Sequence, residues 1–343
     1  MIDIRPRPDF GRFLDTLLLR RAYRRPPLFD FHVDAAHKSR VIDREAATPA
    51  DDVEFWRRAG YDYVQVSVCV VPRELANAGD RHGAEGHAIT SLDQFLSRRW
   101  SWQDASEGNL ACIRDQLDRL IAVAKALPGE MKILLHTADI FTFAWMLMGF
   151  TNFCLKAIEE PDLVAAVMDS LAAATLNAMV AAIDVAGSAA GVLFYSDDIA
   201  YTEGLMLSPR FFGDRLFPHI RRLVEIGRSH GLPLAYHTDG RLYDVFDQLA
   251  DIGVGGIQPL EPKSMDPLLI KRRWGGSFCL MGNIDLDLLA RGDGDDVEAE
   301  VRRKVETIGA GGGYMPGVSN TVPHYVRYAN YKRMIETVYS FGD

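Results

Sequence analysis

The chain has 343 residues, of which 48% are hydrophobic and 25% are charged, a composition typical of globular proteins. Its net charge of −9 argues against a nucleic-acid-binding protein, because such proteins need basic surfaces to neutralise phosphates. Two local basic clusters, at 20–25 and 271–273, are interpreted as solvated faces.

The four cysteines are widely spaced and include no CxxC pair, which favours reduced thiols in a cytoplasm over a disulfide framework. The first ten residues, MIDIRPRPDF, lack the apolar core of a signal peptide. The longest apolar stretch, 163–187, is interrupted by Asp169, Asn177 and Asp184, so it predicts a buried helix rather than a membrane span. We therefore expect a cytoplasmic protein that does not bind membranes.

Eight short apolar runs predict buried strands in chain order. They lie at 27–31, 63–69, 132–136, 192–196, 233–237, 256–259, 278–281 and 313–316. Helical patterns lie between them and after the last one, at 110–127, 208–230, 242–252, 295–308 and 323–341. This alternation predicts an α/β fold, a closed (β/α)8 TIM-type barrel. The alternative is an open doubly wound sheet, but a helix follows the eighth strand and no dinucleotide glycine fingerprint is present.

A minimal barrel needs roughly 250 residues, and the surplus lies in two places. One is an N-terminal arm, 1–26, with a helical pattern at 10–21, and the other is an insertion, 72–109, after the second predicted strand. We expect a single domain over 1–343. The insertion is interpreted either as a lid over a binding pocket or as a surface excursion held down by its tryptophans. Its notable residues are His82, His87, Arg98, Arg99, Trp100 and Trp102.

Polar side chains follow the predicted strands at their carboxyl ends, which a barrel brings to one mouth. A ring of imidazoles and carboxylates is costly there unless its members are paired, bound to metal or functional. Because neighbouring residues alternate faces along a strand, not all of them can point inward. The candidates are His32, His136, Tyr195, Asp197, Asp198, His237, Asp239, Glu261, Asn283 and Asn320.

His237 and Asp239 are two residues apart and so can face the same side. Together with Glu261 after the next strand they would supply three ligands, and three protein ligands with one open position is a catalytic zinc pattern. The alternative is that Asp239 and Gly240 form a turn in which the aspartate caps the helix near Leu242. His237 would then be a hydrogen-bonded barrel histidine.

The adjacent carboxylates Asp197 and Asp198 offer a second possibility. They could serve as acid and base if their surroundings separate their pKa values. Alternatively, one faces the pocket and the other pairs with a surface arginine. We expect one functional carboxylate of the two.

Three segments carry a family resemblance: 141–164 (FTFAWMLMGFTNFCLKAIEEPDLV), 207–262 (LSPRFF to PLEP) and 278–323 (FCLMGNID to NTVP). They resemble the uroporphyrinogen decarboxylase superfamily in order and spacing. The resemblance implies a TIM-type barrel with its active site at the C-terminal mouth. It also implies one of two chemistries, either cofactor-free decarboxylation of porphyrinogens or cobalamin-linked methyl transfer, often with zinc.

The sequence departs from both branches. The decarboxylases carry an arginine-rich segment after the first strand, where this chain reads DFHVDAAHK, and an aspartate after the second, where it has VQVSVCV with Cys69. The thiol-methylating branch has His-x-Cys after the fifth strand and a further cysteine after the eighth. Here Asp239 replaces the first cysteine and Ser319 lies near the second. A site with oxygen ligands could still bind zinc. Zinc held by oxygen is a harder Lewis acid than zinc held by thiolates, which suits it to polarising a methoxy group.

The resulting hypothesis is a cobalamin-linked methyltransferase or demethylase that acts on a small methylated substrate. A corrinoid carrier protein would exchange the methyl group, and the resemblance also implies a possible homodimer. We expect His237, Asp239 and Glu261 to bind the metal. The expected catalytic residues are Asp198, Tyr195 and His237. The expected substrate-binding residues are His32, His136, Asn283 and Asn320.

Two alternatives remain open. The first is a metal-independent decarboxylase or lyase on another carboxylate, which would need cationic groups in the pocket. Its only candidates are Arg241, Arg273 and the arginines of the insertion. The second is a non-enzymatic barrel that binds a tetrapyrrole or corrinoid.

Overall fold

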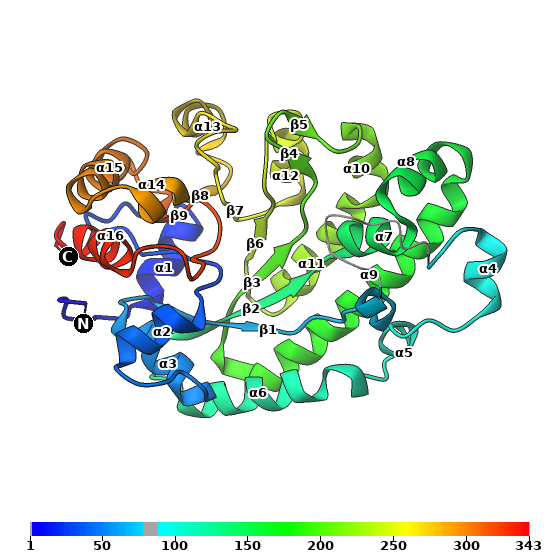
Figure 1. Cartoon of the computed structure of the whole chain (residues 1–343), viewed down its shortest axis with the longest axis horizontal. Coiled ribbons are helices and arrows are strands. Elements are labelled where there is room, and N and C mark those ends of the chain that lie inside the picture. The colour runs from blue at the N-terminus through cyan, green and yellow to red at the C-terminus, as the bar shows by residue number, and fades with distance from the viewer. Residues whose placement is uncertain (1, 78–87, 343) are drawn as a thin grey trace.

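The computed structural model describes residues 2–77 and 88–342. Its centre is a curled sheet of seven parallel strands, and helices pack around it (Figure 1). Each strand coincides with a predicted one, which confirms the barrel-like α/β fold. In sheet order they are β1 (Tyr63–Ser67), β2 (Lys132–Ala138), β3 (Ala190–Ser196), β6 (Leu234–His237), β7 (Gly256–Gln258), β8 (Cys279–Ile284) and β9 (Tyr314–Val318).

The predicted first strand, 27–31, does not form a strand, so that prediction is wrong. The segment nevertheless lies where the eighth strand would close the barrel. The Phe29 N–H donates to the Pro316 carbonyl of β9 at 3.0 Å, and the Asp30 N–H donates to the Tyr63 hydroxyl of β1 at 2.9 Å. These bonds, together with those from the Tyr63 hydroxyl to the Asp30 carbonyl and from the Val318 N–H to the Asp30 carboxylate, stand in for two ladders.

Two features explain why this segment makes no ladder. Pro26 precedes it and Pro27 is its first residue, and proline cannot donate a ladder hydrogen bond. The chain also approaches β9 very closely, because a Cβ placed on Gly317 would lie 1.5 Å from the Phe29 carbonyl oxygen. Only glycine permits that approach.

The principal helices cover the outside of the sheet (Figure 1). They are α2 (Ala35–Ile42), α3 (Pro49–Arg58), α6 (Arg114–Ala126), α7 (Ile140–Met148), α8 (Phe150–Glu159), α9 (Pro161–Ala186), α10 (Pro209–Arg215), α11 (Phe217–Ser229), α12 (Phe246–Ile252), α13 (Pro267–Trp274), α14 (Leu286–Arg291), α15 (Gly294–Thr307) and α16 (Tyr328–Tyr339). The single helix expected at 208–230 is two, α10 and α11, because Pro218 cannot donate into a continuous helix. The Ser208 side chain caps α10.

Helix α9 is long and apolar enough, by length and composition alone, to cross a membrane. This differs from the expectation that its polar residues would rule out a span. In the structure 61% of its most apolar window is buried within the protein, and it packs against α5 (Gln103–Ser106), α6, α7 and α8. Burial in the core accounts for its apolar composition.

The described part of the insertion is held down by tryptophans. Trp100 and Trp102 are buried and stack with ring centroids 5.4 Å apart. The Trp102 indole N–H donates to the Ser170 hydroxyl of α9 at 3.0 Å. These contacts favour the interpretation of the insertion as a surface segment held down by its tryptophans. Its role as a lid over a binding pocket stays a prediction. His82 and His87 lie outside the described residues.

The barrel interior is filled with aromatic rings between the arm helix α1 (Phe10–Leu17) and the mouth. Phe29 packs on Phe194 at 5.4 Å between centroids, and Phe194 packs on Phe31 at 5.0 Å. Phe31 in turn contacts His136 at 4.7 Å and His237 at 5.0 Å. Phe31 is therefore an apolar floor directly beneath the histidines of the mouth.

Candidate active site

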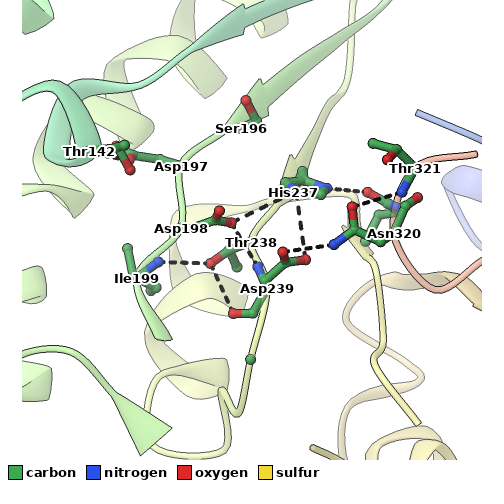
Figure 2. A network of polar contacts seen from close by, with 12 residues as sticks. Thr142, Ser196, Asp197, Asp198, Ile199, His237, Thr238, Asp239, Asn320 and Thr321 are labelled. Carbon is green, nitrogen blue, oxygen red and sulfur yellow. Dashed lines mark hydrogen bonds and ion pairs between the residues drawn. The ribbon is translucent and has the colours of Figure 1, made fainter. Parts of the chain in front are cut away.

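The structure brings Asp198, His237 and Asp239 together at the carboxyl ends of β3 and β6. Ser196, the last residue of β3, pairs in register with His237, the last residue of β6. One ligand atom from each of the three residues lies within 4.8 Å of the others. Figure 2 shows both aspartates turned toward the imidazole. Two of the three predicted metal ligands, His237 and Asp239, are in this cluster.

A hydrogen bond to Gln258 sets the tautomer of His237. The Gln258 amide nitrogen donates to the Asn320 carbonyl at 3.3 Å, so the amide oxygen faces Nδ1 of His237, with which it is hydrogen-bonded. That oxygen can only accept, so Nδ1 carries a proton. In the neutral ring, Nε2 is left with its lone pair facing the aspartates, 3.8 Å from Asp198 Oδ1 and 3.8 Å from Asp239 Oδ1.

Only one of the two carboxylate oxygens of Asp239 accepts a hydrogen bond from the described residues. Its Oδ2 accepts a hydrogen bond from the Asn320 side chain at 2.8 Å, whereas its buried Oδ1 has no hydrogen-bond donor among the described residues. Burial raises the pKa of Asp239 to about 6, the neighbouring charges of Asp198 and Glu261 add to this, and a proton on His237 would oppose it. Burial therefore disfavours the charged form of Asp239 relative to an exposed aspartate.

A tight turn positions the two aspartates. Gly240 has φ +86°, and a Cβ there would lie 2.6 Å from the backbone of Ala200 and Tyr201, in the hairpin of β4 (Ala200–Tyr201) and β5 (Gly204–Leu205). The Asp239 N–H donates to Asp198 Oδ1 at 3.0 Å. Helix α12 has Val245 at its N-cap, so the alternative that Asp239 caps this helix is wrong.

Glu261, the third predicted ligand, is not in the cluster of three. Its Oε2 accepts hydrogen bonds from the Gly240 N–H and the Ser264 hydroxyl, both at 3.0 Å. It supports the turn that carries Asp239 and borders a pocket of about 190 Å³ that Asn320 also lines. Asp198 takes the place that the sequence suggested for Glu261.

The adjacent carboxylates Asp197 and Asp198 point in opposite directions (Figure 2). Asp197 accepts from the N–H groups of Phe141 and Thr142 at the start of α7, at 2.7 and 2.9 Å. Burial raises its pKa to about 6, which these hydrogen bonds oppose. Its partner is thus a helix N-terminus rather than the surface arginine considered above, and only Asp198 faces the cluster.

Tyr195, a predicted catalytic residue, lies on the other face of β3. Its hydroxyl donates to Asp197 at 2.6 Å and accepts from the Ile140 N–H at 3.1 Å. Because strand residues alternate faces, the neighbours of Tyr195 point inward and its own ring points toward α7. The structure does not bring it to the cluster.

The predicted substrate-binding residues are dispersed around the mouth. His136 points inward between the Ser67 and Ser196 hydroxyls, each at 2.9 Å. Burial lowers the pKa of His136 to about 3, so it is neutral. His32 is exposed.

Asn283 and Asn320 are placed differently. Asn283 is buried and donates to the Leu260 carbonyl, and its side-chain oxygen has no hydrogen-bond partner among the described residues. Asn320 contacts the cluster directly through Asp239.

Gln258 is the site residue that sequence reasoning missed. It ends β7 and is fully buried, and the only signal was one polar residue inside an apolar run. A polar side chain in that place must find partners.

Several of the arginines that could bind a substrate carboxylate have partners close to them in the chain. Arg241 stacks over Tyr243 and Arg273 over Trp274, 5.6 and 4.4 Å from the ring centroids. In the insertion, Arg99 pairs with Asp104 and Glu107, and Arg98 stacks on Trp100. These four cations are engaged with neighbouring side chains.

Comparisons with known proteins agree with this architecture. The chain is similar to a methyltransferase from Methanosarcina mazei, with a TM-score of 0.69 at 18% identity, over 98% of this chain and 99% of that one. It is also similar to a protein provisionally named a vitamin-B12 independent methionine synthase from Listeria monocytogenes, with a TM-score of 0.53 at 10% identity, over 94% and 98%. At these identities the likeness concerns the fold.

A search of curated proteins finds no match. The family model described as uroporphyrinogen decarboxylase (URO-D) matches residues 98–341. That match spans most of the chain, including every strand of the barrel after β1 and all three members of the cluster, and the chain therefore belongs to the uroporphyrinogen decarboxylase family.

Proposed function

We propose that this chain is a metal-assisted methyltransferase or demethylase that takes a methyl group from a small methylated substrate, such as a methoxy compound. The observation that carries the proposal is the cluster of Asp198, His237 and Asp239 at the barrel mouth. The fold likeness to a methyltransferase supports the same reaction class.

Two of the three donor pairs have a spacing that fits a zinc ion, and all three donor atoms lie within 4.8 Å of one another. Nε2 of His237 lies 3.8 Å from one oxygen of each aspartate, and two ligands that each bind zinc at about 2.1 Å lie at most about 4.2 Å apart. A cation there would also satisfy Oδ1 of Asp239, which lacks a donor. We propose that these three residues hold the ion, with Asp198 in the place expected for Glu261. Bound zinc would act as a Lewis acid on the substrate oxygen.

The surrounding residues prepare the site. Gln258 keeps the proton on Nδ1 of His237, and Asn320 holds one oxygen of Asp239, so the free donor atoms face one another before anything binds. Neutral His136 and the Phe31 ring form an uncharged floor. That floor suits a neutral substrate better than a carboxylate.

Electrostatics favour methyl transfer over the carboxy-lyase alternative. A lyase must hold the substrate carboxylate, which arginine does best. Arg241, Arg273 and Arg99 stack or pair with neighbouring side chains, and the cluster itself carries two carboxylates. An anionic substrate would be repelled there.

We further propose that a separate corrinoid protein exchanges the methyl group and docks at the same mouth. The described residues form one barrel with helical additions, so cobalamin would arrive with its own carrier. A cytoplasmic location and a homodimer stay predictions from the sequence.

The first test is metal content, measured by elemental analysis of protein purified without added metal. Wild type and Glu261→Gln should hold near-stoichiometric zinc, and His237→Ala and Asp198→Asn should lose it. Loss in Glu261→Gln with retention in Asp198→Asn would restore the ligand set expected from the sequence. A wild-type protein that binds no zinc even when zinc is supplied would contradict the metal proposal.

The second test is turnover. Wild-type protein with cob(I)alamin and a methyl aryl ether should convert the cobalamin absorbance to that of methylcobalamin, and a chelator should stop the reaction. Carbon dioxide release from carboxylates, unaffected by chelator, would favour the lyase. Stoichiometric corrinoid binding without turnover would favour the non-enzymatic barrel.

A further inference from the structure

A separate pocket of about 480 Å³ lies at the opposite end of the sheet from the mouth. Its walls come from three segments that are far apart in the chain, 19–22 of the N-terminal arm, part of 271–276, and 310–313. The second and third segments lead into the first residues of β8 and β9, whereas His237 is the last residue of β6. Because parallel strands all begin at one end of a barrel and finish at the other, this pocket is distinct from the candidate active site.

The two basic clusters of the sequence, 20–25 and 271–273, meet at this pocket. They supply its three charged lining residues, which are Arg20, Arg21 and Lys271. No acidic residue is among the described residues that line it. Asp15 lies 4.0 Å from Arg20, whereas Arg21 and Lys271 have no ion-pair partner in the described part of the chain. Positive charge therefore exceeds negative charge around this pocket.

Lys271 is a half-buried cation that has no carboxylate beside it among the described residues. Its ammonium donates a hydrogen bond to the Gly312 carbonyl. An ammonium has three N–H donors, so two remain for a ligand. Burial lowers the pKa of Lys271, because a charge in a poorly solvated place is costly unless an opposite charge offsets it. An anion in the pocket would supply that opposite charge.

Glycines leave the backbone of this pocket open to a ligand. Five of the eleven lining residues are glycines. A Cβ placed on Gly276 or Gly311 would meet no atom within 4 Å, so both positions face open space. Where no side chain covers the backbone, the oxygens of an anion can approach peptide N–H groups closely, as they do at many phosphate sites.

We infer that this pocket binds a small phosphorylated molecule. Its volume of about 480 Å³ lies in the range of small-molecule sites and exceeds what a lone ion would fill. Two guanidinium groups and one ammonium match the charge and the hydrogen-bond acceptors of phosphate. No aromatic residue is among the described lining residues, which favours a compact ligand such as a sugar phosphate over one with an aromatic base.

The test is calorimetric titration of the full-length protein with inorganic pyrophosphate, and with citrate as an anion that lacks phosphorus. Gly276→Glu places a carboxylate in the pocket at a position with room for a side chain. Gly129→Glu is the matched control, because a Cβ there also meets no atom within 4 Å and Gly129 does not line this pocket. A second variant, Lys271→Gln, removes the ammonium charge but keeps a donor for the Gly312 carbonyl.

We expect saturable pyrophosphate binding in wild type and Gly129→Glu, weakened at least about 10-fold in Gly276→Glu and in Lys271→Gln. Wild-type affinity in both of these variants, or no saturable binding by wild type, would overturn the inference. Citrate binding as tight as that of pyrophosphate would overturn the phosphate assignment. The zinc content of Gly276→Glu should equal that of wild type, so a failure here is distinguishable from a failure of the proposed methyl-transfer site.

Discussion

Asp30 at the barrel closure and Asp239 at the mouth are both buried carboxylates with raised pKa values, but their surroundings differ. Burial raises the pKa of Asp30 to about 7 and that of Asp239 to about 6. Both oxygens of Asp30 accept hydrogen bonds, one from the Val318 N–H at 2.8 Å and one from the Tyr61 hydroxyl. One oxygen of Asp239 accepts none among the described residues.

We propose that this difference separates a structural carboxylate, Asp30, from a functional one, Asp239. A shifted pKa reports burial in both places and so does not identify a site by itself. The satisfied network around Asp30 joins the 27–31 segment to β9 and, through Tyr61 and Tyr331 at 2.8 Å, to α16. The unsatisfied oxygen of Asp239, beside a second carboxylate and an imidazole, is where we propose that a cation binds.

The largest effect should come from the mouth. His237→Ala should lower methyl transfer by on the order of 10³-fold, because it removes the only imidazole of the cluster, while circular dichroism stays that of the wild type. Asp30→Asn is the control and should keep wild-type turnover. Wild-type activity in His237→Ala would remove this residue from the site.

The next effect concerns stability. Asp30→Ala leaves the Val318 N–H and the Tyr61 hydroxyl without their acceptor, so the free energy of unfolding should fall by about 3 kcal/mol. Asp239→Ala should cost less than about 1 kcal/mol, since it removes a carboxylate that burial disfavours. Urea denaturation measures both. A larger loss for Asp239→Ala would reverse the assignment of the two roles.

Gln258 should have an intermediate effect. Gln258→Leu removes the acceptor that keeps Nδ1 of His237 protonated and should weaken zinc binding about 10- to 100-fold. Gln258→Glu keeps an acceptor and should restore most of the affinity. Competition with a chromophoric chelator measures this, and equal affinities in both variants would show that the tautomer is set elsewhere.

The smallest effect is a pH slope. Because the pKa of Asp30 is about 7 in the folded protein and near 4 in the unfolded chain, only the folded state holds this proton between those values. The free energy of unfolding should therefore fall as pH rises from about 4 to about 7. In Asp30→Asn this fall should be shallower by up to about 1.4 kcal/mol per pH unit. Parallel curves for the two proteins would contradict a protonated Asp30.

Much of the fold could be predicted because buried parallel strands leave a local signal. Seven of the eight predicted apolar runs coincide with the seven strands of the central sheet. The run at 27–31 has the same composition but no ladder, since the prolines before it and the close approach at Gly317 are consequences of its neighbours. The division of 208–230 into α10 and α11 was foreseeable from Pro218 alone.

The candidate site was predictable in part for the same reason. His237, Asp239 and Asp198 follow strands, so sequence order places them at one mouth. Which way each side chain turns depends on strand phase and on loop contacts, so Tyr195 and Glu261 were assigned roles at a cluster that does not contain them. Gln258 gave almost no local signal, because its partners are 21 and 62 residues away along the chain.

By itself the sequence determined the strand–helix alternation, the placement of the polar candidate residues at one mouth, and the absence of cysteine ligands beside His237. Each depends on residue type and short spacing, which are local properties. Tertiary structure alone decided that Asp198 joins the cluster and Asp197 caps α7, that Gln258 orients the imidazole, and that the two basic clusters of the sequence line one pocket. These outcomes depend on distances between residues far apart in the chain, which only packing sets.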